Sequence, residues 1–313
     1  MSLVLYADPV FADHQMPAGH PECPARNAAA VSALAASPLI ARREGASPGE
    51  VADVERIHDP DYVAAIEALA EAGGGSLDPD TYVSPRSYAV ALDAIGTAVA
   101  ATEAALAAEG DDPARRAFAA VRPPGHHARP AKGMGFCLFN NVAVAAARAR
   151  AVHGLDRVCV VDFDVHHGNG TQDAFYRDGG VHFVSIHGRG YYPGTGADDE
   201  TGEGPGAGTT WNRALPAKTQ PPQYQDTFRA AMDSVLAYEP QLILVSAGFD
   251  AYIDDPLGNL NLEEEHFHWI GAELRQAADA VCEGRLVALL EGGYDLEQLG
   301  NLVAAFVGGV AGS

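Results

Sequence analysis

The sequence contains few basic residues and few cysteines. Only 20 of its 313 residues are Lys or Arg, against 42 Asp and Glu, so the formal net charge is −22 at pH 7. A chain this acidic lacks the broad basic surface that binds phosphate backbones, and we expect no nucleic-acid partner. The four cysteines lie far apart and form no Cys-x-x-Cys pair, which favours reduced thiols in a cytoplasmic protein.

Long apolar runs are also missing. A membrane-spanning helix needs about 18 consecutive apolar residues, and no uncharged run of that length occurs, so we expect no membrane partner. The first residues contain no basic segment, and Asp8 and Pro9 end the initial apolar run, so we expect no secretory signal peptide. Since no polar linker or change of composition divides the chain, we expect residues 1–313 to form one domain. The sequence leaves open whether copies associate into a homo-oligomer.

Short runs rich in Val and Ile alternate with Ala-rich stretches of helical character. This alternation is typical of βαβ units around a parallel sheet and predicts an α/β fold. The expected strands are Leu3–Tyr6, Ala117–Val121, Val158–Phe163, His182–Ile186, Leu242–Ser246 and Leu286–Leu290. The expected helices are Pro24–Leu34, Asp61–Glu71, Pro85–Ala108, Asn140–His153, Pro222–Tyr238, Leu262–Val281 and Leu296–Val307. The Gly- and Pro-rich residues 188–208 are expected to form a long surface loop.

Four of the expected strands lead directly into segments crowded with His, Asp, Gly and Tyr. The segments are Arg122–His127, Asp162–Gly170, Ser246–Asp250 and Glu291–Tyr294. In an open parallel sheet, ligands bind beyond the carboxyl ends of the strands. The sequence therefore predicts that these four segments converge on one crevice.

The second of these segments has the composition of a metal site. Asp162, Asp164 and His166 alternate with apolar residues, so in an extended chain they share one face. Two carboxylates and an imidazole are costly to desolvate without a cation, and this donor set suits Zn²⁺ or Fe²⁺. Asp250 is the candidate for a third protein ligand, which would leave a position for water as in catalytic metal sites.

The paired histidines and a tyrosine supply candidates for proton transfer. His126 and His127 follow a rigid Pro-Pro-Gly approach, and neutral His near pH 7 serves as general base or acid. Tyr294 follows two glycines that permit close backbone approach to a ligand. Each signal is weak alone, because adjacent histidines occur by chance and a buried Tyr is common. Their weight comes from their place at the strand ends.

Two other patterns resemble functional motifs without supporting one. His266 and His268 lie beside three Glu residues, but side chains two apart on a helix do not face each other, so we expect a solvated acidic face. Residues 202–208 are Gly-rich, yet they do not match Gly-x-Gly-x-x-Gly, and Pro205 among acidic residues argues against a phosphate site.

Taken in order, these and further motifs resemble the histone deacetylase family, which includes bacterial deacetylase-like amidohydrolases and acetylpolyamine amidohydrolases. The match extends from about His20 to Tyr294. It implies the arginase/deacetylase fold, a single α/β domain with a parallel sheet flanked by helices on both faces. The motifs are Arg122-Pro-Pro-Gly-His-His-Ala128, Gly135-Phe-Cys-Leu-Phe-Asn-Asn141, Asp162-Phe-Asp-Val-His-His-Gly-Asn-Gly170, Tyr192-Pro-Gly-Thr-Gly196, Ala247-Gly-Phe-Asp250 and Glu291-Gly-Gly-Tyr294.

The resemblance also implies roles for single residues. Asp164, His166 and Asp250 match the family's metal ligands, His126 and His127 its paired histidines, and Tyr294 its carbonyl-polarising tyrosine. Asp162 matches the carboxylate behind the first histidine and part of a potassium site that uses carbonyls near His166, Ser185 and Ile186. Asn169 stands behind the second histidine, where class I members have Asp, and with Glu291 resembles class II.

The remaining implied positions surround the substrate. Gly135, Phe136 and Tyr192 match the walls of a narrow acyl-lysine channel, with Tyr192 where many relatives have Phe. Leu257 falls where polyamine-selective relatives can carry an acidic residue, which favours a lysine substrate. Residues 188–191 depart from the usual sequence before the Tyr-Pro-Gly-Thr-Gly segment, so the shape of the pocket rim is left open.

These observations lead to one expected function and three alternatives. We expect a zinc-dependent amidohydrolase, with Fe²⁺ as the other candidate metal, that removes an acetyl or related acyl group from an acylated lysine side chain. His127 is the expected base and acid, with His126 as electrostatic support. The alternatives are hydrolysis of acetylpolyamines or another acylated small amine, a binuclear ureohydrolase like arginase, and a non-catalytic metal-dependent binding module.

Overall fold

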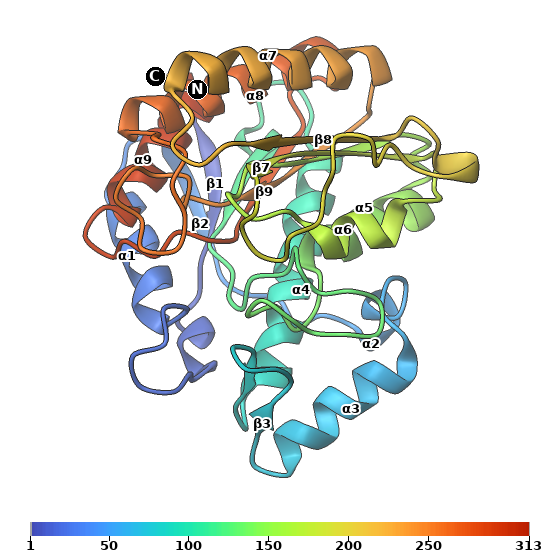
Figure 1. The fold of residues 1–313 in the computed structure, drawn as a ribbon, viewed down its shortest axis with the longest axis vertical. Helices are drawn as coiled ribbons and strands as arrows, with labels where there is room; N and C mark the ends of the chain where they lie inside the picture. The colour runs from blue at the N-terminus through green and yellow to red at the C-terminus, as the bar shows by residue number, and fades with distance from the viewer. Residues whose placement is uncertain (1, 313) are drawn as a thin grey trace.

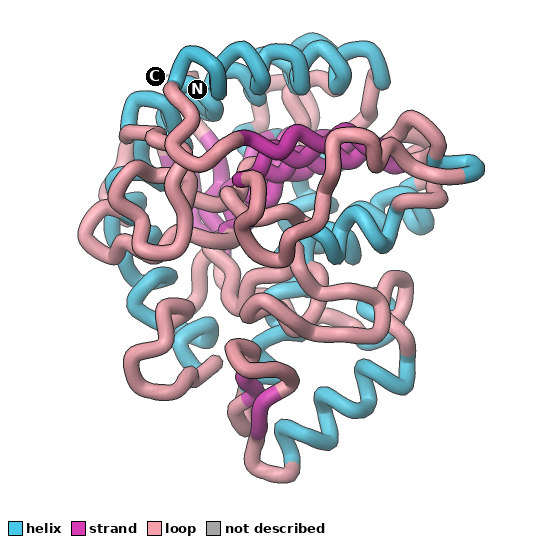
Figure 2. The backbone as a smooth tube through the Cα atoms, viewed as in Figure 1, coloured by secondary structure: helices cyan, strands magenta, loops and turns pink. Residues whose placement is uncertain are grey.

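The centre of the protein is a single parallel sheet. In the computed structural model, which describes residues 2–312, eight strands pair in the order β2-β1-β5-β10-β9-β6-β7-β8, and each neighbouring pair is parallel (Figure 1). Figure 2 shows these strands inside the molecule, surrounded by helices and loops. The strands are β1 Leu3–Tyr6, β2 Ile40–Glu44, β5 Arg116–Ala119, β6 Val158–Asp162, β7 Val181–Gly188, β8 Thr210–Leu215, β9 Ile243–Ala247 and β10 Leu286–Leu290. A separate antiparallel pair joins β3 Gly75–Ser76 to β4 Tyr82–Val83.

Helices cover both faces of the sheet, as Figure 1 shows. The alternation of side chains along each strand assigns the faces. Leu3 and Leu5 of β1 pack in one apolar core with α1, α7, α8 and α9, whereas Val4 and Tyr6 pack in a second core with α4 and α5. The helices are α1 Pro24–Leu34, α2 Val51–Val54, α3 Pro60–Glu71, α4 Ser87–Ala107, α5 Asn141–His153, α6 Asn169–Phe175, α7 Pro221–Tyr238, α8 Glu264–Val281 and α9 Leu299–Ala311.

The predicted α/β fold is confirmed, and all six predicted strands belong to the large sheet. Strands β2 and β8 were not predicted, because both lie at edges of the sheet and hold Arg and other polar side chains instead of a continuous apolar run. Residues 189–209 connect β7 to β8 as a long loop with one short helical turn, as expected.

The expected acidic face is present, because Glu263, Glu264 and Glu265 are all exposed, but His266 does not belong to it. His266 is buried, and its Nδ1 accepts the backbone N–H of Glu263 while the Glu263 side chain accepts a backbone N–H in return. This reciprocal arrangement caps the start of α8. His266 therefore stabilises the start of α8 and is not part of a metal site with His268.

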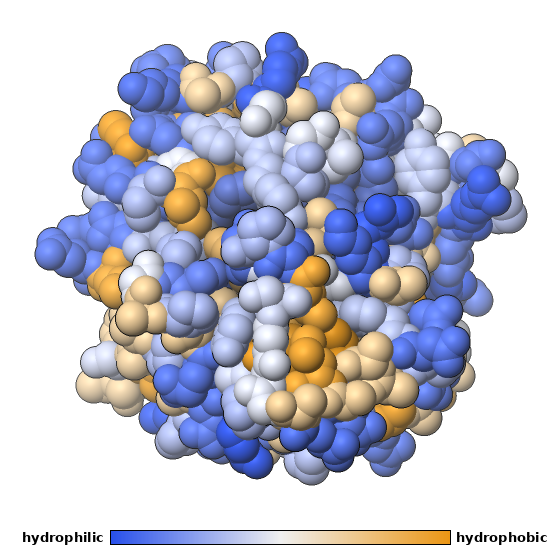
Figure 3. Space-filling view, turned by 60° about the horizontal axis from the view of Figure 1, so that its bottom comes forward, coloured by the Kyte–Doolittle hydropathy of each residue, from blue (hydrophilic) through white to orange (hydrophobic). Residues whose placement is uncertain are grey.

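Helix α4 is the one described helix that is long and apolar enough to cross a membrane by length and composition alone. Most of its apolar window is buried inside the protein, where Val90, Ala94 and Ala98 pack beneath the sheet. The surface in Figure 3 is largely hydrophilic, with hydrophobic side chains confined to small clusters, in keeping with the acidic composition.

A buried group of charges fastens the N-terminal region to the strand ends. Arg122 donates to both carboxylate oxygens of Glu22, with Nε–Oε1 at 2.5 Å and Nη2–Oε2 at 2.8 Å, and Arg26 donates to Oε1 at 3.2 Å. All three side chains are fully buried. Arg26 also donates to the backbone oxygens of Glu291 and Gly293. These paired charges hold Arg122, which precedes the His126 loop, and the backbone of the loop after β10 in place.

Candidate active site

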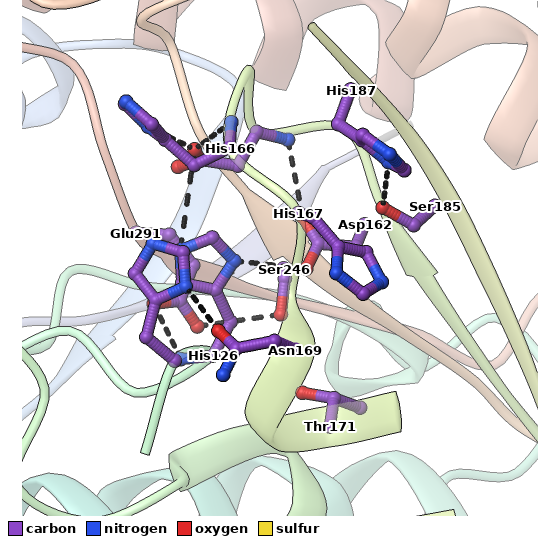
Figure 4. Close-up of polar contacts among 12 residues, drawn as sticks. His126, Asp162, His166, His167, Asn169, Thr171, Ser185, His187, Ser246 and Glu291 are labelled. Carbon is purple, nitrogen blue, oxygen red and sulfur yellow. Dashed lines mark hydrogen bonds and ion pairs between the residues drawn. The ribbon is translucent and has the colours of Figure 1, made fainter. Parts of the chain in front are cut away.

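The four segments rich in His, Asp, Gly and Tyr follow four strands that are neighbours in the sheet. The order β5-β10-β9-β6 places their carboxyl ends side by side, so the predicted convergence is confirmed. Figure 4 shows side chains from these segments directed toward one another. Strand β6 ends at Asp162, yet the alternation continues beyond it, because Phe163 and Val165 pack in the core with α7 and α8. The polar residues between them are left facing the site.

Asp164, His166 and Asp250 lie together as the sequence predicted. Nδ1 of His166 is 3.0 Å from Oδ1 of Asp164 and 3.0 Å from Oδ2 of Asp250, and the three donor atoms lie within 4.8 Å of one another. All three residues are buried. A methyl group on Gly292 would lie 2.1 Å from Asp250 Oδ2 and 2.5 Å from Asp164 Oδ2, so glycine is required for this close approach of the backbone.

The chemistry of this cluster fits a divalent cation. Burial raises the pKa of Asp250 to about 7, and the like charge of Asp164 adds to the effect. Burial opposes protonation of His166, but the charge of Asp250 and hydrogen bonds to both carboxylates raise its pKa to about 10. The cluster by itself therefore holds extra protons at neutral pH. A divalent cation replaces those protons and lets both carboxylates ionise beside a neutral imidazole, the donor set of Zn²⁺ and Fe²⁺ sites.

His126 is held by an acidic partner on each side. Its Nδ1 lies 2.9 Å from Oδ2 of Asp162, and its Nε2 lies 4.0 Å from Oδ1 of Asp164. Although burial opposes protonation, these two carboxylates raise the pKa of His126 to about 10. The Glu291 carboxylate fixes the backbone here, because Oε2 accepts N–H bonds from Gly125 at 2.7 Å and His126 at 3.2 Å. His126 is therefore a rigid, positively charged neighbour of the carboxylate cluster.

His127 has a neutral partner instead. Its Nδ1 lies 2.8 Å from Oδ1 of Asn169, while the Asn169 Nδ2 donates to the Met134 sulfur at 3.6 Å. Because the sulfur takes the amide N–H, the amide oxygen faces His127 and receives its Nδ1–H. Burial and the neighbouring His126 lower the pKa of His127 well below its ordinary value. His127 is thus neutral, with the lone pair of Nε2 available to accept a proton.

Tyr294 follows β10 and packs between Phe136 and Arg26. Its ring is 5.8 Å from that of Phe136 in an edge-to-face arrangement, and the Arg26 guanidinium carbon lies 4.7 Å from its centre. Desolvation raises the pKa of the Tyr294 phenol well above its ordinary value; Arg26 opposes this shift, and Asp250 and Asp164 reinforce it. The phenol therefore stays protonated and is a hydrogen-bond donor at neutral pH.

The predicted wall residues flank the same space. The Tyr192 ring lies 5.1 Å from the His127 ring, edge to face. Gly135 has a φ of 55°, and a Cβ there would meet His127 Cδ2 at 2.4 Å and Tyr192 Cε1 at 2.8 Å. Leu257 lies on the Asp250 loop, which contacts the Tyr294 backbone through Asp255. The structure therefore brings all the predicted site residues to one end of the sheet.

The sequence analysis gave no role to three residues that support this site: Glu22, Arg26 and Asp255. Glu22 and Arg26 lie near the start of the family resemblance, in His20-Pro-Glu-Cys-Pro-Ala-Arg26, and nothing in that segment indicates a contact with the loop after β10. Asp255 precedes a proline in an ordinary turn sequence. Their contacts span 39 to 267 residues along the chain and emerge only from the fold.

Comparison with known proteins assigns the family. The histone deacetylase domain model matches residues 20–310. The chain belongs to the histone deacetylase family. It is 41% identical over 281 residues to a histone deacetylase-like amidohydrolase of Pseudomonas aeruginosa, covering 88% of this chain and 73% of the relative. It is 41% identical over 297 residues to a probable deacetylase of Methanothermobacter thermautotrophicus, covering 94% and 86%. The crystal structure of the HDA15 HD domain matches with a TM-score of 0.92 and 31% identity over 100% of this chain and 90% of that one.

Membership in the histone deacetylase family makes the chain a relative of amide hydrolases and agrees with the expected fold. The alternative of an arginase-like ureohydrolase finds no support in these matches. The roles expected for the single site residues remain predictions, and the geometry around His127 supplies a direct test of one of them.

Replacing Asn169 by Asp should move the acidic limb of the pH profile of kcat/KM upward. A carboxylate 2.8 Å from His127 Nδ1 favours the imidazolium and should raise the pKa of His127. If His127 acts as a neutral base, activity is then lost at higher pH than in the wild type. Asn301→Asp adds the same charge at an exposed position of α9 and should leave the limb in place. A limb that does not move in Asn169→Asp would exclude His127 as the group that sets it.

Proposed function

We propose that the protein is a metal-dependent amidohydrolase that removes the acetyl group from N-acetyl-lysine side chains. The observation that carries the proposal is the convergence of three elements at one crevice. These are the buried Asp164–His166–Asp250 cluster, the neutral His127 on its Asn169 partner, and the protonated Tyr294 phenol. Together they offer a metal site, a base and an oxyanion donor, the parts that amide hydrolysis requires.

Asp164, His166 and Asp250 would hold Zn²⁺ or Fe²⁺. When bound, such a metal lowers the pKa of water and polarises an amide carbonyl. The K⁺ expected near Asp162 remains a prediction, and so does the cytoplasmic location.

The residues around the metal site perform the proton transfers. His127 accepts a proton from the attacking water at Nε2, the nitrogen that the Asn169 contact leaves free. Tyr294 donates its phenol hydrogen bond to the carbonyl oxygen as negative charge develops there. His127 then returns the proton to the amide nitrogen, so that the C–N bond breaks to give acetic acid and a neutral amine. The acid then loses its proton to the amine or to water and leaves as acetate. His126, which is held by Asp162 at 2.9 Å, gives electrostatic support as negative charge develops.

The walls of the site favour a slender substrate. Tyr192 and Gly135 lie on one side with His127, and Phe136 lies against Tyr294 on the other. An acylated lysine presents a four-carbon stem that fits between aromatic rings, with its peptide backbone left outside. Leu257 adds no charge that would select the ammonium groups of a polyamine.

Acetylpolyamines remain the alternative substrate class. The carboxylates of Asp78 and Asp80 lie near the wall residue Phe136, because both accept hydrogen bonds from Thr81, whose hydroxyl oxygen accepts the Phe136 N–H at 3.1 Å. Negative charge at the rim attracts cations, whether on a polyamine or on a basic peptide.

A substrate comparison with metal-reconstituted protein tests the proposal. We expect kcat/KM for an acetyl-lysine peptide to exceed that for N-acetylspermidine by about 10-fold or more, the effect of roughly 1.4 kcal/mol of transition-state discrimination. A ratio inverted in favour of N-acetylspermidine would assign the enzyme to the polyamine class. No turnover on any acyl amide would leave a binding module and overturn the proposal.

A further inference from the structure

Asp255 connects two loops of the site, which follow the neighbouring strands β9 and β10. One oxygen, Oδ1, accepts N–H bonds from its own loop, from Leu257 at 2.9 Å and Gly258 at 3.3 Å. The other oxygen, Oδ2, accepts N–H bonds from the loop after β10, from Tyr294 at 2.6 Å and Asp295 at 3.3 Å. The residue is buried, with 9% of its surface exposed. One carboxylate therefore serves four backbone amides from two segments.

We infer that Asp255 is a positioning residue that sets the place of the Tyr294 phenol relative to the Asp250 loop. Its bond to the Tyr294 N–H is the shortest of the four and acts on the backbone of the residue that bears the phenol. The same carboxylate accepts the Leu257 N–H, so it couples the backbone position of Tyr294 to that of Leu257. The catalytic part of this inference rests on the proposed function. The clamp, meaning the four hydrogen bonds by which Asp255 joins the two loops, does not depend on that function.

The role requires a carboxylate. An Asn side chain offers one oxygen and an NH₂ group, so one pair of backbone amides would face a donor instead of an acceptor. Hydrogen bonds to a charged group are stronger than those between neutral groups. The loops stay attached elsewhere in such a variant, because Phe249 N–H donates to Gly292 O at 3.1 Å and Gly292 N–H donates to Asp164 Oδ2 at 2.8 Å. Asp255→Asn should therefore fold with a loosened Tyr294 loop.

The first test measures amide hydrogen exchange and needs no substrate. In Asp255→Asn, peptides covering residues 255–260 and 291–299 should exchange roughly 10-fold faster or more, as expected when a charge-assisted bond is lost. The matched control is Asp254→Asn, which removes the same charge from the adjacent exposed residue. Asp255→Ser, with a single short acceptor, serves as a second variant if Asp255→Asn does not fold. Unchanged exchange in both segments would overturn the inference.

The second test asks whether Asp255 acts through Tyr294. We expect Asp255→Asn to lower kcat for the acetyl-lysine peptide about 10- to 100-fold, with a smaller change in KM and no loss of bound metal. In the Tyr294→Phe background the same substitution should change kcat by no more than about 2-fold, because the phenol that it positions is absent.

An equal loss of kcat in both backgrounds would mean that Asp255 does not act through the phenol, and the positioning role would be overturned. If the wild-type protein hydrolysed no acyl amide, the proposed function would fail, and the exchange measurement would still decide whether the clamp exists. The two failures are therefore distinguishable.

Discussion

Replacing His166 by Ala should remove bound divalent metal and activity together. The imidazole Nδ1 lies 3.0 Å from a carboxylate oxygen of both Asp164 and Asp250, so its loss takes away one of three donors and leaves two buried carboxylates facing each other. A site with two protein ligands binds metal weakly. Loss of several kcal/mol of electrostatic stabilisation of the transition state corresponds to a fall in kcat/KM of about 10³-fold or more.

Metal content per chain after dialysis, measured by elemental analysis, should be about one for the wild type and near zero for the variant. His153→Ala, which removes an exposed imidazole beside Glu103, is the matched control and should keep both metal and activity. Two metals per wild-type chain would point to the binuclear class instead. A variant with full metal occupancy would show that His166 is no ligand.

The parts of the site that the sequence predicted share one property, which is that they depend on local pattern. Continuous Val- and Ile-rich runs mark buried parallel strands, and β10 begins and ends where that pattern does. Asp164 and His166 were recognised by their alternation with apolar residues, although the chain bends after Asp162 and Asp164 Oδ1 accepts the His166 N–H at 2.9 Å. Convergence with Asp250 follows from a general rule about strand ends in parallel sheets. None of these inferences needs a contact between specific distant residues.

The parts that the sequence did not predict depend on such contacts. Strands β2 and β8 hold Arg and other polar residues because they lie at the edges, and only the assembled sheet shows where its edges are. The pairing of Glu22 with Arg122 spans 100 residues, and the contact of Glu291 with the Gly125 N–H spans 166. A carboxylate looks the same in the sequence whether it faces water or holds two loops together.

Tyr294 was recognised from the sequence, whereas Asp255, whose carboxylate accepts the Tyr294 backbone N–H, was not. A tyrosine after two glycines is a visible motif, whereas Asp255 resembles any turn aspartate. The structure adds what the motif lacks. Arg26 lies over one side of the Tyr294 ring and Phe136 meets it edge to face, so the phenol has a defined place beside the carboxylate cluster.

Tyr294→Phe should lower kcat about 10²- to 10³-fold, the usual effect of removing one oxyanion donor. The Phe ring keeps the packing against Phe136 and Arg26, and the backbone N–H keeps its bond to Asp255, so the fold and the metal content should be unchanged. KM should change little, because the phenol contributes mainly as charge develops on the carbonyl oxygen. Steady-state kinetics on an acetyl-lysine peptide, with thermal unfolding and metal analysis, measure each of these quantities.

The matched control is Tyr238→Phe. Tyr238 is the last residue of helix α7, and its phenol donates to the Gly179 carbonyl oxygen at 2.9 Å. Its kcat should stay at the wild-type value, because that hydroxyl belongs to none of the four segments of the site.

Because desolvation keeps the Tyr294 phenol protonated well above its ordinary pKa, the ratio of wild-type to Tyr294→Phe kcat should stay constant from pH 6 to about pH 9. A ratio that falls toward one across this range would mean that the phenol ionises there and is not the oxyanion donor, and a kcat equal to that of the control would leave Tyr294 with a packing role alone.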